Sequence, residues 1–519
     1  MTSAVVIDRP DTRRGGRTVR ITTSEVTASE VVAVACGDAR VEVAPEVEAL
    51  VAASRAVIEV ALAGATPVYG LNTGLGPRRD ERVSAVLLAD YQRHIVLSHA
   101  GAVGRPLDDA DSRAVVFARL VGLTRGGSGA SPDVLAAMAN ILNARVHPVI
   151  PEIGSVGASD IGALAAVASV LIGHGRARYQ GTEMSGADAL LAAGLRPAVL
   201  APKDALALIS ANAVSIGIGA GVALRAAAVA RLADLAGALT LEAVGGNLSP
   251  FDPEVQQAKP FPGQRDAAAS VLAALRGSYL RSGPRTMSVQ DPLSIRTIPQ
   301  VHGAYREQVD RALHAVTVEL NGRGDNPLVS PETGRTLSNG NFHPMVMALA
   351  FDSLRIGAAH VGGIGERRIS KLALRYDGDV SIDQRVRSGA VPRLPMTLTH
   401  SAATLSSQLR HLAGPATLSL PPVGHDVEDH GTLAPLTVSQ TLRSLEKLEL
   451  LFSIEILFAA ACVAAMPQPP RLGAGTRPVY EAAVTVLDDV LRSPTAAQFV
   501  ERLRAGLADH VDASAGRLR

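Results

Sequence analysis

The chain has 519 residues, 47% of them hydrophobic but only 3% aromatic, and it contains no tryptophan. Its 50 lysines and arginines almost balance its 49 aspartates and glutamates, which excludes a strong overall attraction to nucleic acid or to an anionic membrane. We therefore expect a small-molecule substrate, with no nucleic-acid and no membrane partner.

The first 21 residues are expected to form a flexible tail, because acidic residues lie among their arginines and no apolar segment of a signal peptide is present. Cys36 and Cys462 are the only cysteines, and they lie far apart and outside any metal-binding pattern. Such cysteine usage favours a reducing compartment. The sequence thus predicts a cytoplasmic protein.

Apolar residues recur at helical spacing along most of the chain, and the abundant alanine and leucine are strong helix formers. The pattern predicts helices at Val47–Ala63, Ala85–Ser98, Ala114–Leu123, Val134–Asn143, Pro202–Ala243, Pro299–Leu320, Pro344–Leu372, Ser401–Leu412 and Leu436–Met466. Turn-rich segments, where functional groups should gather, are Gly70–Arg79, Gly126–Pro132, Pro148–Ser159, Pro250–Gln264, Gly322–Asn341 and Pro415–Pro435. The predicted fold is all-α, with a loop-rich part over residues 22–222 and a long-helix bundle with C-terminal helices over residues 223–519.

Two apolar stretches, Ala205–Leu224 and Leu448–Met466, approach the length that a membrane span requires. The first contains the polar Ser210 and Asn212, and the second contains Glu455. Small and polar residues of this kind suit helices that are buried among other helices, so we expect both stretches in a protein core.

The segment Gly154–Asp160 reads Gly-Ser-Val-Gly-Ala-Ser-Asp and directly precedes a very apolar helix expected over residues 161–172. Two glycines before Ala158 and Ser159 are typical of a reactive backbone turn, and equally of an ordinary loop that leads into a helix. This segment alone does not decide between the two readings.

Seven further segments, taken in order along the chain, resemble segments of histidine and phenylalanine ammonia-lyases. They are Pro67–Gly76, Gln92–His99, Gln290–Arg296, Glu319–Pro327, Gly340–His343, Gly365–Ile369 and Val427–His430. The resemblance runs from about Thr22 to about Pro469, and an ordered series is far more specific than any single match.

The resemblance implies an ammonia-lyase-like long helical bundle that forms a homotetramer, with active sites assembled from loops of more than one chain. In that family an Ala-Ser-Gly triplet cyclises to 4-methylideneimidazole-5-one, an electrophile that captures the substrate and helps ammonia to leave. Ala158-Ser159-Asp160 stands at that place here. No metal and no external cofactor is implied.

The resemblance also assigns residue roles. Tyr69 matches the catalytic base, and because an ordinary tyrosine has a pKa of about 10 it would need activation. Arg296 matches the residue that clamps the substrate carboxylate, for which a guanidinium fork suits two oxygens. Gln290 and Asn326 match positions that hydrogen-bond around the electrophile and the substrate. A packed aromatic for Tyr69, a surface arginine for Arg296 and a turn contact for Asn326 are the structural alternatives.

His99 and Glu428 match positions that meet the imidazole side of the substrate in histidine-specific members, and Phe342 is expected to line the pocket. A histidine at a helix end is also often a cap or a core residue. Lys371 and Arg393 lie near the matched loops, and the sequence leaves their roles open.

The chain departs from the family pattern at three of these positions. The triplet lacks its glycine, so that Asp160 stands for the acid that normally follows it, and a Cβ there restricts the strained backbone that cyclisation demands. Leu293 replaces a tyrosine. Ser210 aligns with an expected asparagine, although Asn212 lies two residues further on.

Three functions follow from this reading. In the first, the prosthetic group still forms from Ala158-Ser159-Asp160, and the protein eliminates ammonia from histidine or a related amino acid to give an α,β-unsaturated acid. In the second, it eliminates another amine, such as trimethylamine from a histidine betaine, without the prosthetic group. In the third, it is a catalytically silent subunit of an active lyase. The two enzyme readings require Tyr69, Arg296 and the turn at 158–160 to meet around one cavity.

Overall fold

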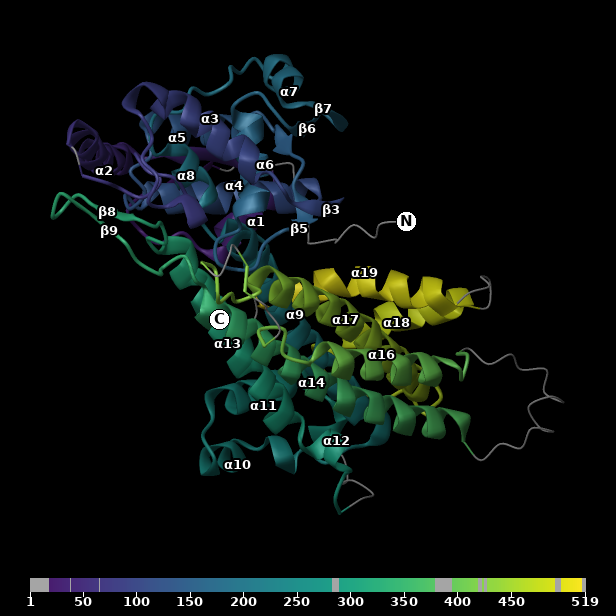
Figure 1. The fold of residues 1–519 in the computed structure, drawn as a ribbon. Helices are drawn as coiled ribbons and strands as arrows, with labels where there is room; N and C mark the ends of the chain where they lie inside the picture. The colour runs from purple at the N-terminus through teal and green to yellow at the C-terminus, as the bar shows by residue number, and fades with distance from the viewer. Residues whose placement is uncertain are drawn as a thin grey trace.

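Long helices dominate the computed structural model, which describes residues 18–37, 39–64, 66–281, 289–378, 394–418, 422–423, 427–490 and 496–515. Four of them pack side by side as a bundle: α9 (Ala213–Val244), α13 (Ile298–Asn321), α14 (Met345–Asp377) and α17 (Ala434–Ala464). The smaller N-terminal part caps one end of this bundle (Figure 1). The mainly helical fold is therefore confirmed. Arg393 lies outside the described residues.

Shorter helices surround the bundle. They are α10 (Pro253–Ala258), α11 (Pro262–Ala274), α12 (Leu293–Arg296), α16 (Leu398–Leu412), α18 (Thr476–Val490) and α19 (Ala496–Ala515), with one 3-10 turn at Ser249–Phe251 and another at Tyr279–Arg281. Small residues allow the long helices to approach closely. A Cβ added to Gly365 of α14, for example, would lie 2.8 Å from Cδ2 of Leu451 in α17. The alanine and glycine content therefore explains the dense packing of this bundle.

The N-terminal part combines helices with short strands. Its helices are α1 (Ala28–Cys36), α2 (Pro45–Ala63), α3 (Leu88–His99), α4 (Asp109–Thr124), α5 (Pro132–Asn143), α6 (Ile161–Leu171), α7 (Gly186–Ala192) and α8 (Asp204–Ile209), with 3-10 turns at Gly76–Arg78 and Ala85–Leu87. Its strands are β1 (Thr18–Ile21), β2 (Arg40–Val43), β3 (Val103–Pro106), β4 (His147–Pro148), β5 (Pro151–Ile153), β6 (Arg176–Tyr179) and β7 (Thr182–Ser185). β1 and β2 pair in parallel, β3 pairs with β5, and β6 lies between β4 and β7. A hairpin of β8 (Leu328–Ser330) and β9 (Arg335–Leu337) follows α13.

Four local expectations differ from the structure. The last four residues of the expected tail form β1, because Val19 and Ile21 are buried against the core. The helix predicted at Pro202–Ala243 is interrupted between α8 and α9. The turn-rich segment predicted at Pro250–Gln264 contains α10 and the start of α11. The expected division at residue 222 lies inside α9, which runs unbroken through both parts.

One helical stretch among the described residues, Asp204–Val244, is long and apolar enough to cross a membrane, and 89% of its most apolar window is buried inside the molecule. Such burial is typical of a core helix. Within Leu448–Met466, Leu448, Phe452 and Glu455 are also fully buried. Both stretches therefore pack inside the protein, as the polar residues within them predicted.

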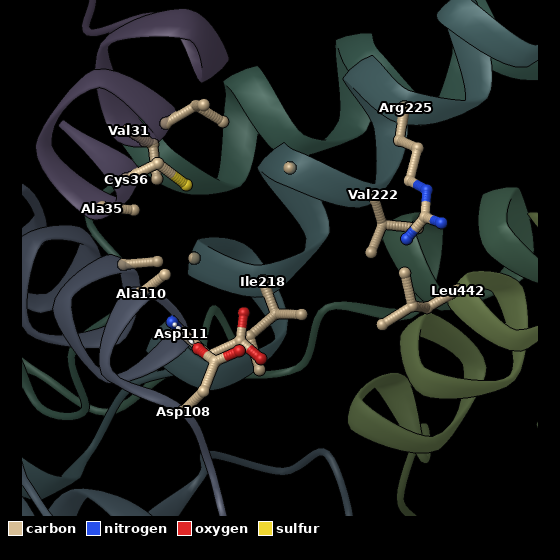
Figure 2. Close-up of a pocket in the computed structure, with 14 residues that line it drawn as sticks. Val31, Ala35, Cys36, Asp108, Ala110, Asp111, Ile218, Val222, Arg225 and Leu442 are labelled. Carbon is tan, nitrogen blue, oxygen red and sulfur yellow. Dashed lines mark hydrogen bonds between the residues drawn. The ribbon is translucent and has the colours of Figure 1, made fainter. Parts of the chain in front are cut away.

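A cavity of about 90 Å³ lies between α1, α4, α9 and α17 (Figure 2). Its wall is mostly apolar, with Val222 and Leu442 at one end. The carboxyl groups of Asp108 and Asp111 and the thiol of Cys36 lie at the other end (Figure 2). None of the predicted site residues lines it. The functional site must therefore be sought elsewhere.

Candidate active site

Ser159 lies in the turn that leads into α6, and its backbone is left-handed, with a φ of 68°. Its amide nitrogen donates to Oδ1 of Asn212 at 3.1 Å and to the carbonyl oxygen of Phe342 at 3.2 Å. Asn212 Nδ2 donates to the same carbonyl at 2.9 Å. The Oγ of Ser159 is buried without a hydrogen-bond partner among the described residues. Since an unsatisfied buried hydroxyl costs free energy, this turn is suited to meet a ligand.

The side chain of Asp160 lies at the break between α8 and α9. Its carboxylate accepts hydrogen bonds from Ser155 Oγ at 2.6 Å, from the Val214 amide at 2.9 Å and from the Ser215 amide at 3.1 Å. The two amides belong to the first turn of α9, whose N–H groups have no partner within the helix. Complete burial nevertheless raises the pKa of Asp160 to about 6, against these hydrogen bonds. This tertiary contact explains why the predicted single helix is two.

The segment that contains Glu428 is bound to the same turn. The Leu433 amide donates to the carbonyl of Val156 at 3.0 Å, and Thr432 Oγ1 donates to the carbonyl of Gly157 at 2.8 Å. Gly157 has a φ of 72°, and a Cβ there would lie 2.2 Å from Thr432 Oγ1. Only glycine permits this close approach, which brings Thr432 and Leu433 onto the turn.

Tyr69 lies half-buried in the loop after α2, where its hydroxyl oxygen accepts a hydrogen bond from the Gly76 amide at 3.1 Å. Burial raises the pKa of Tyr69 above its ordinary value. The Gly76 hydrogen bond and the charge of Arg79 oppose this rise, whereas the nearby charge of Glu428 adds to it. The surroundings of Tyr69 within one chain thus favour the phenol over the phenolate, and a base at this position needs a further cation.

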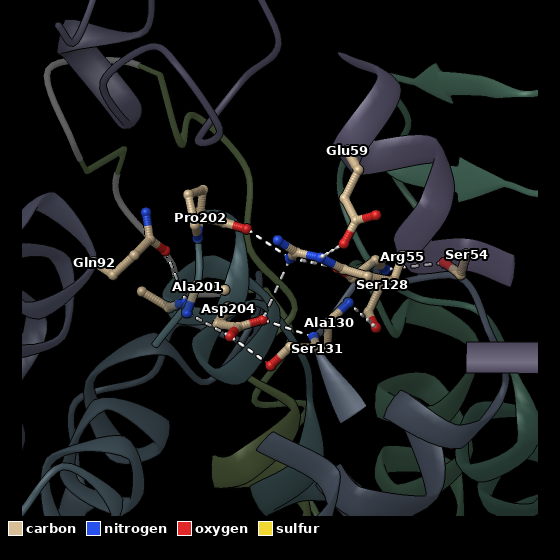
Figure 3. Close-up of polar contacts among 12 residues, drawn as sticks. Ser54, Arg55, Glu59, Gln92, Ser128, Ala130, Ser131, Ala201, Pro202 and Asp204 are labelled. Carbon is tan, nitrogen blue, oxygen red and sulfur yellow. Dashed lines mark hydrogen bonds and ion pairs between the residues drawn. The ribbon is translucent and has the colours of Figure 1, made fainter. Parts of the chain in front are cut away.

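A buried polar network holds α8, which leads to Ser210 and Asn212. The Asp204 carboxylate accepts from the amide and the Oγ of Ser131 at 2.8 and 2.7 Å, and Arg55 Nη1 lies 3.8 Å from it (Figure 3). Gln92 Oε1 accepts from the Ala205 amide at 3.1 Å (Figure 3). The network therefore fixes α8 between α2 and α3.

Other predicted residues have mainly structural contacts in a single chain. His99 lies at the end of α3, and its Nδ1 lies 2.7 Å from the Ile95 carbonyl, to which it can only donate. Asn326 Oδ1 accepts from the Asn339 amide at 3.1 Å, as the turn-contact alternative expects. Ser210 is buried where α8 ends. Within the described part of the chain, no hydrogen bond uses His99 Nε2, Asn326 Nδ2 or the Ser210 hydroxyl.

Arg296, Gln290 and Leu293 lie at the other end of the bundle, around α12 (Figure 1). Ser294 of α12 is hydrogen-bonded to Arg368, which follows Met345 by 23 residues in α14, or roughly 35 Å at the rise of an α-helix. Phe342, just before that helix, contacts the turn at 158–160. One chain therefore does not bring Arg296 to Tyr69, contrary to our expectation. Lys371 lies near the Arg368 end of α14.

Two residues that sequence reasoning missed lie beside the turn. His343 Nε2 and His430 Nδ1 are 2.9 Å apart, with their ring centroids 5.0 Å apart. Burial and the neighbouring His430 both lower the pKa of His343. The sequence could have indicated these two histidines, because both matched segments, Gly340–His343 and Val427–His430, end in them.

Comparison with known proteins places this geometry in a family, since residues 26–485 match the model of the aromatic amino acid lyases. The chain belongs to this family. A relative named histidine ammonia-lyase, from Alkaliphilus metalliredigens, is 36% identical over 89% of this chain and 91% of its own length. The activity expected of this lyase is therefore the breaking of a carbon–nitrogen bond, which is the chemistry of its family.

Two solved structures are similar to this lyase over 96% of its chain. One is the ergothioneine-degrading enzyme ergothionase from Treponema denticola, in complex with desmethyl-ergothioneine sulfonic acid, with a TM-score of 0.88, 25% identity and 99% of that chain covered. The other is histidine ammonia-lyase from Trypanosoma cruzi, with a TM-score of 0.83, 28% identity and 95% covered. They confirm the predicted fold.

The residues of the turn do not fit the prosthetic group that the resemblance implied. Cyclisation needs the amide nitrogen of the third residue to attack the carbonyl carbon of Ala158. The Asp160 amide instead donates to the carbonyl of Ala211 at 2.6 Å, and its side chain is fixed by the start of α9. Moving this nitrogen to Ala158 would break the buried contacts of the Asp160 carboxylate, which are costly to lose.

Proposed function

We propose that this lyase eliminates ammonia from histidine or a related amino acid and leaves an α,β-unsaturated acid. The similarity to proteins named histidine ammonia-lyase supports this substrate class. The observation that carries the proposal is the buried turn in which the Ser159 amide donates to Asn212 and to which Thr432 is bound. Glu428 lies four residues before Thr432, and its charge acts on the nearby Tyr69. The unpaired cysteines agree with a cytoplasmic location.

Tyr69 acts as the base in this proposal. Its phenolate takes the β-proton, the electrons of that C–H bond form the double bond between the α and β carbons, and the amine leaves with the electrons of the carbon–nitrogen bond. The amine leaves as a neutral molecule only when its nitrogen is positively charged in the substrate. That same positive charge, next to Tyr69, lowers the pKa of the phenol and so activates the base.

The carboxylate clamp comes from another chain of a homotetramer. Arg296 Nη1 donates to Gln290 Oε1 at 2.9 Å, whereas its Nε is buried without a hydrogen-bond partner in the described part of the chain. A guanidinium with one free donor edge is suited to a substrate carboxylate. A partner's α12 would thus bring Arg296, Gln290 and Leu293 to the turn that lacks them.

The geometry of Asp160 favours a second candidate, which is elimination of a tertiary amine such as trimethylamine from a histidine betaine. A quaternary nitrogen is always positively charged, so it leaves without a proton and without an electrophile to capture it. A primary amine is required mainly because the prosthetic group captures it. Since the turn does not fit that group, the substrate need not be a primary amine. The similarity to an ergothioneine-degrading enzyme supports the same substrate class.

Two measurements test these proposals. Intact mass of the purified chain should be unshifted, whereas a loss of two waters would show that the turn cyclises after all. The purified oligomer is then assayed by absorbance for urocanate-like products from L-histidine and from its trimethyl betaine. Turnover of L-histidine supports the first candidate and turnover of the betaine alone supports the second. No turnover of either would favour the silent subunit.

A further inference from the structure

The segment Gly365–Ile369, which the sequence singled out, places Arg368 in the centre of the bundle. Arg368 of α14 and Glu455 of α17 are both fully buried. Arg368 Nε donates to Glu455 Oε1 at 2.6 Å, and Nη2 donates to Oε2 at 3.0 Å. Such a two-fold contact holds the guanidinium plane in one orientation.

The remaining nitrogen of Arg368 reaches a third element. Its Nη1 donates to the carbonyl oxygen of Ser294, in α12, at 3.1 Å. On the other side, Thr240 Oγ1 of α9 donates to Glu455 Oε1 at 2.7 Å. One buried ion pair therefore ties α12 to three long helices of the bundle.

Stability alone does not explain this arrangement. A buried ion pair is often no more stabilising than apolar residues of the same volume, because both charges lose their hydration. What an apolar pair could not supply is a hydrogen bond to the backbone of α12. The orientation of α12 is therefore the property that Arg368 specifically determines.

α12 needs such support. It has four residues, a single turn, which is too short to be stable by itself. Its outer side chain, Leu293, is 61% exposed. Within the helix, only Ile295 separates Ser294, which Arg368 holds, from Arg296. A shift of the Ser294 carbonyl would thus move the guanidinium of Arg296 with it.

We propose that the Arg368–Glu455 pair positions the substrate-carboxylate clamp: Arg368 fixes the backbone of α12 and so aims Arg296 at the site. This inference rests on the proposed function, in which Arg296 binds the carboxylate. Arg368 touches no substrate in this arrangement and is a positioning residue. The pair thus acts on substrate binding from the core of the bundle.

The first test compares Arg368→Lys with a matched control, Arg225→Lys. A lysine can still pair with Glu455, but it cannot also hold the Ser294 carbonyl in the same plane. Arg225 makes a similar two-fold contact from α9 to Glu449 of α17, at 2.6 and 2.7 Å. The control therefore removes an equivalent contact away from α12.

Hydrogen–deuterium exchange of the intact oligomer is the readout. Amides of residues 290–297 should exchange at least about tenfold faster in Arg368→Lys, and at the wild-type rate in Arg225→Lys. Equal exchange in both variants would overturn the proposal. If Arg368→Lys does not assemble, Glu455→Gln, which keeps the side-chain shape, must show the same local effect, and its absence would count equally against the proposal.

Kinetics separate this inference from the function on which it rests. With whichever of L-histidine and its betaine is turned over, Arg368→Lys should raise KM about tenfold with a smaller change in kcat, and should reduce the preference for the acid over its carboxamide. A merely structural role would leave that preference unchanged. If Arg296→Ala also leaves it unchanged, the clamp itself is wrong. If Arg296→Ala removes it and Arg368→Lys does not, only the positioning role is wrong.

Discussion

At Asp160 the chain departs from the Ala-Ser-Gly triplet that its resemblance to the ammonia-lyases implies. Its amide and carboxylate are both used to join α6 to the break before α9. A glycine after Ser159 would provide the amide nitrogen from a residue without a Cβ, and Asp160 could still follow that glycine. The lost glycine, rather than the acid itself, is therefore what we expect to block cyclisation.

Insertion of one glycine between Ser159 and Asp160 tests this explanation. The inserted chain should show a fraction whose intact mass is lower by two waters, whereas the wild-type chain should not. Insertion of alanine at the same place is the control, because it adds the same length of backbone but keeps a Cβ. An equal shift in both insertions would show that chain length, and not the Cβ, is limiting.

The pKa of Tyr69 leads to a second prediction, which concerns the pH dependence of the activity. Since burial raises the pKa of Tyr69, little phenolate is present at neutral pH and its amount increases as the pH rises. We therefore expect kcat/KM to increase with pH over the range in which the substrate nitrogen stays positively charged. Tyr69→Phe should lower kcat by about 10²- to 10⁴-fold. A value of kcat/KM that falls with pH while the substrate nitrogen is still positively charged, or a fully active variant, would contradict the role of the base.

Among the elements, the start of α4 contains a titratable group with an unusual environment. Asp108 caps the helix by accepting from the Asp111 amide at 2.8 Å, and both carboxyl groups face the cavity in Figure 2. Burial, together with the charge of Asp108, raises the pKa of Asp111 from 3.8 to about 7. The folded state therefore keeps a proton that the unfolded chain releases.

Because the folded pKa lies above the unfolded one, this group's contribution to the free energy of unfolding is present below pH 4 and is lost as the pH rises to about 7. Asp111→Asn should thus raise the free energy of unfolding by about 2 kcal/mol at pH 8, measured as a higher unfolding temperature, and should leave it nearly unchanged at pH 4. Asp133→Asn, at the exposed first turn of α5, is the control. A constant difference at both pH values would refute the assignment.

At the scale of the whole molecule, the long bundle separates the two halves of the proposed site. The helices next to Tyr69 and Ser159, α2 and α6, lie at one end, and α12, which ends with Arg296, lies at the other (Figure 1). No small rearrangement of one chain could join them, since α14 spans the distance between them as a continuous helix. An oligomer is therefore part of the proposed mechanism.

Mixed oligomers test this directly. Tyr69→Phe and Arg296→Ala chains should each be inactive alone. Co-assembly of equal amounts should restore about a quarter of the wild-type activity, because random mixing gives that share of the sites both Tyr69 and Arg296. Recovery would show that the two residues of each site come from different chains. A mixture that stays inactive, although mass spectrometry shows mixed oligomers, would contradict a shared site.

The sequence by itself determined the helices, the family and the segments that form the turn, because helical periodicity and short motifs are local properties of the chain. It could not show the break between α8 and α9, since that break depends on the Asp160 carboxylate, more than fifty residues earlier in the chain. Nor could it show the His343–His430 contact or the separation of Arg296 from Tyr69. Those features result from packing between distant segments, which only the tertiary structure decides.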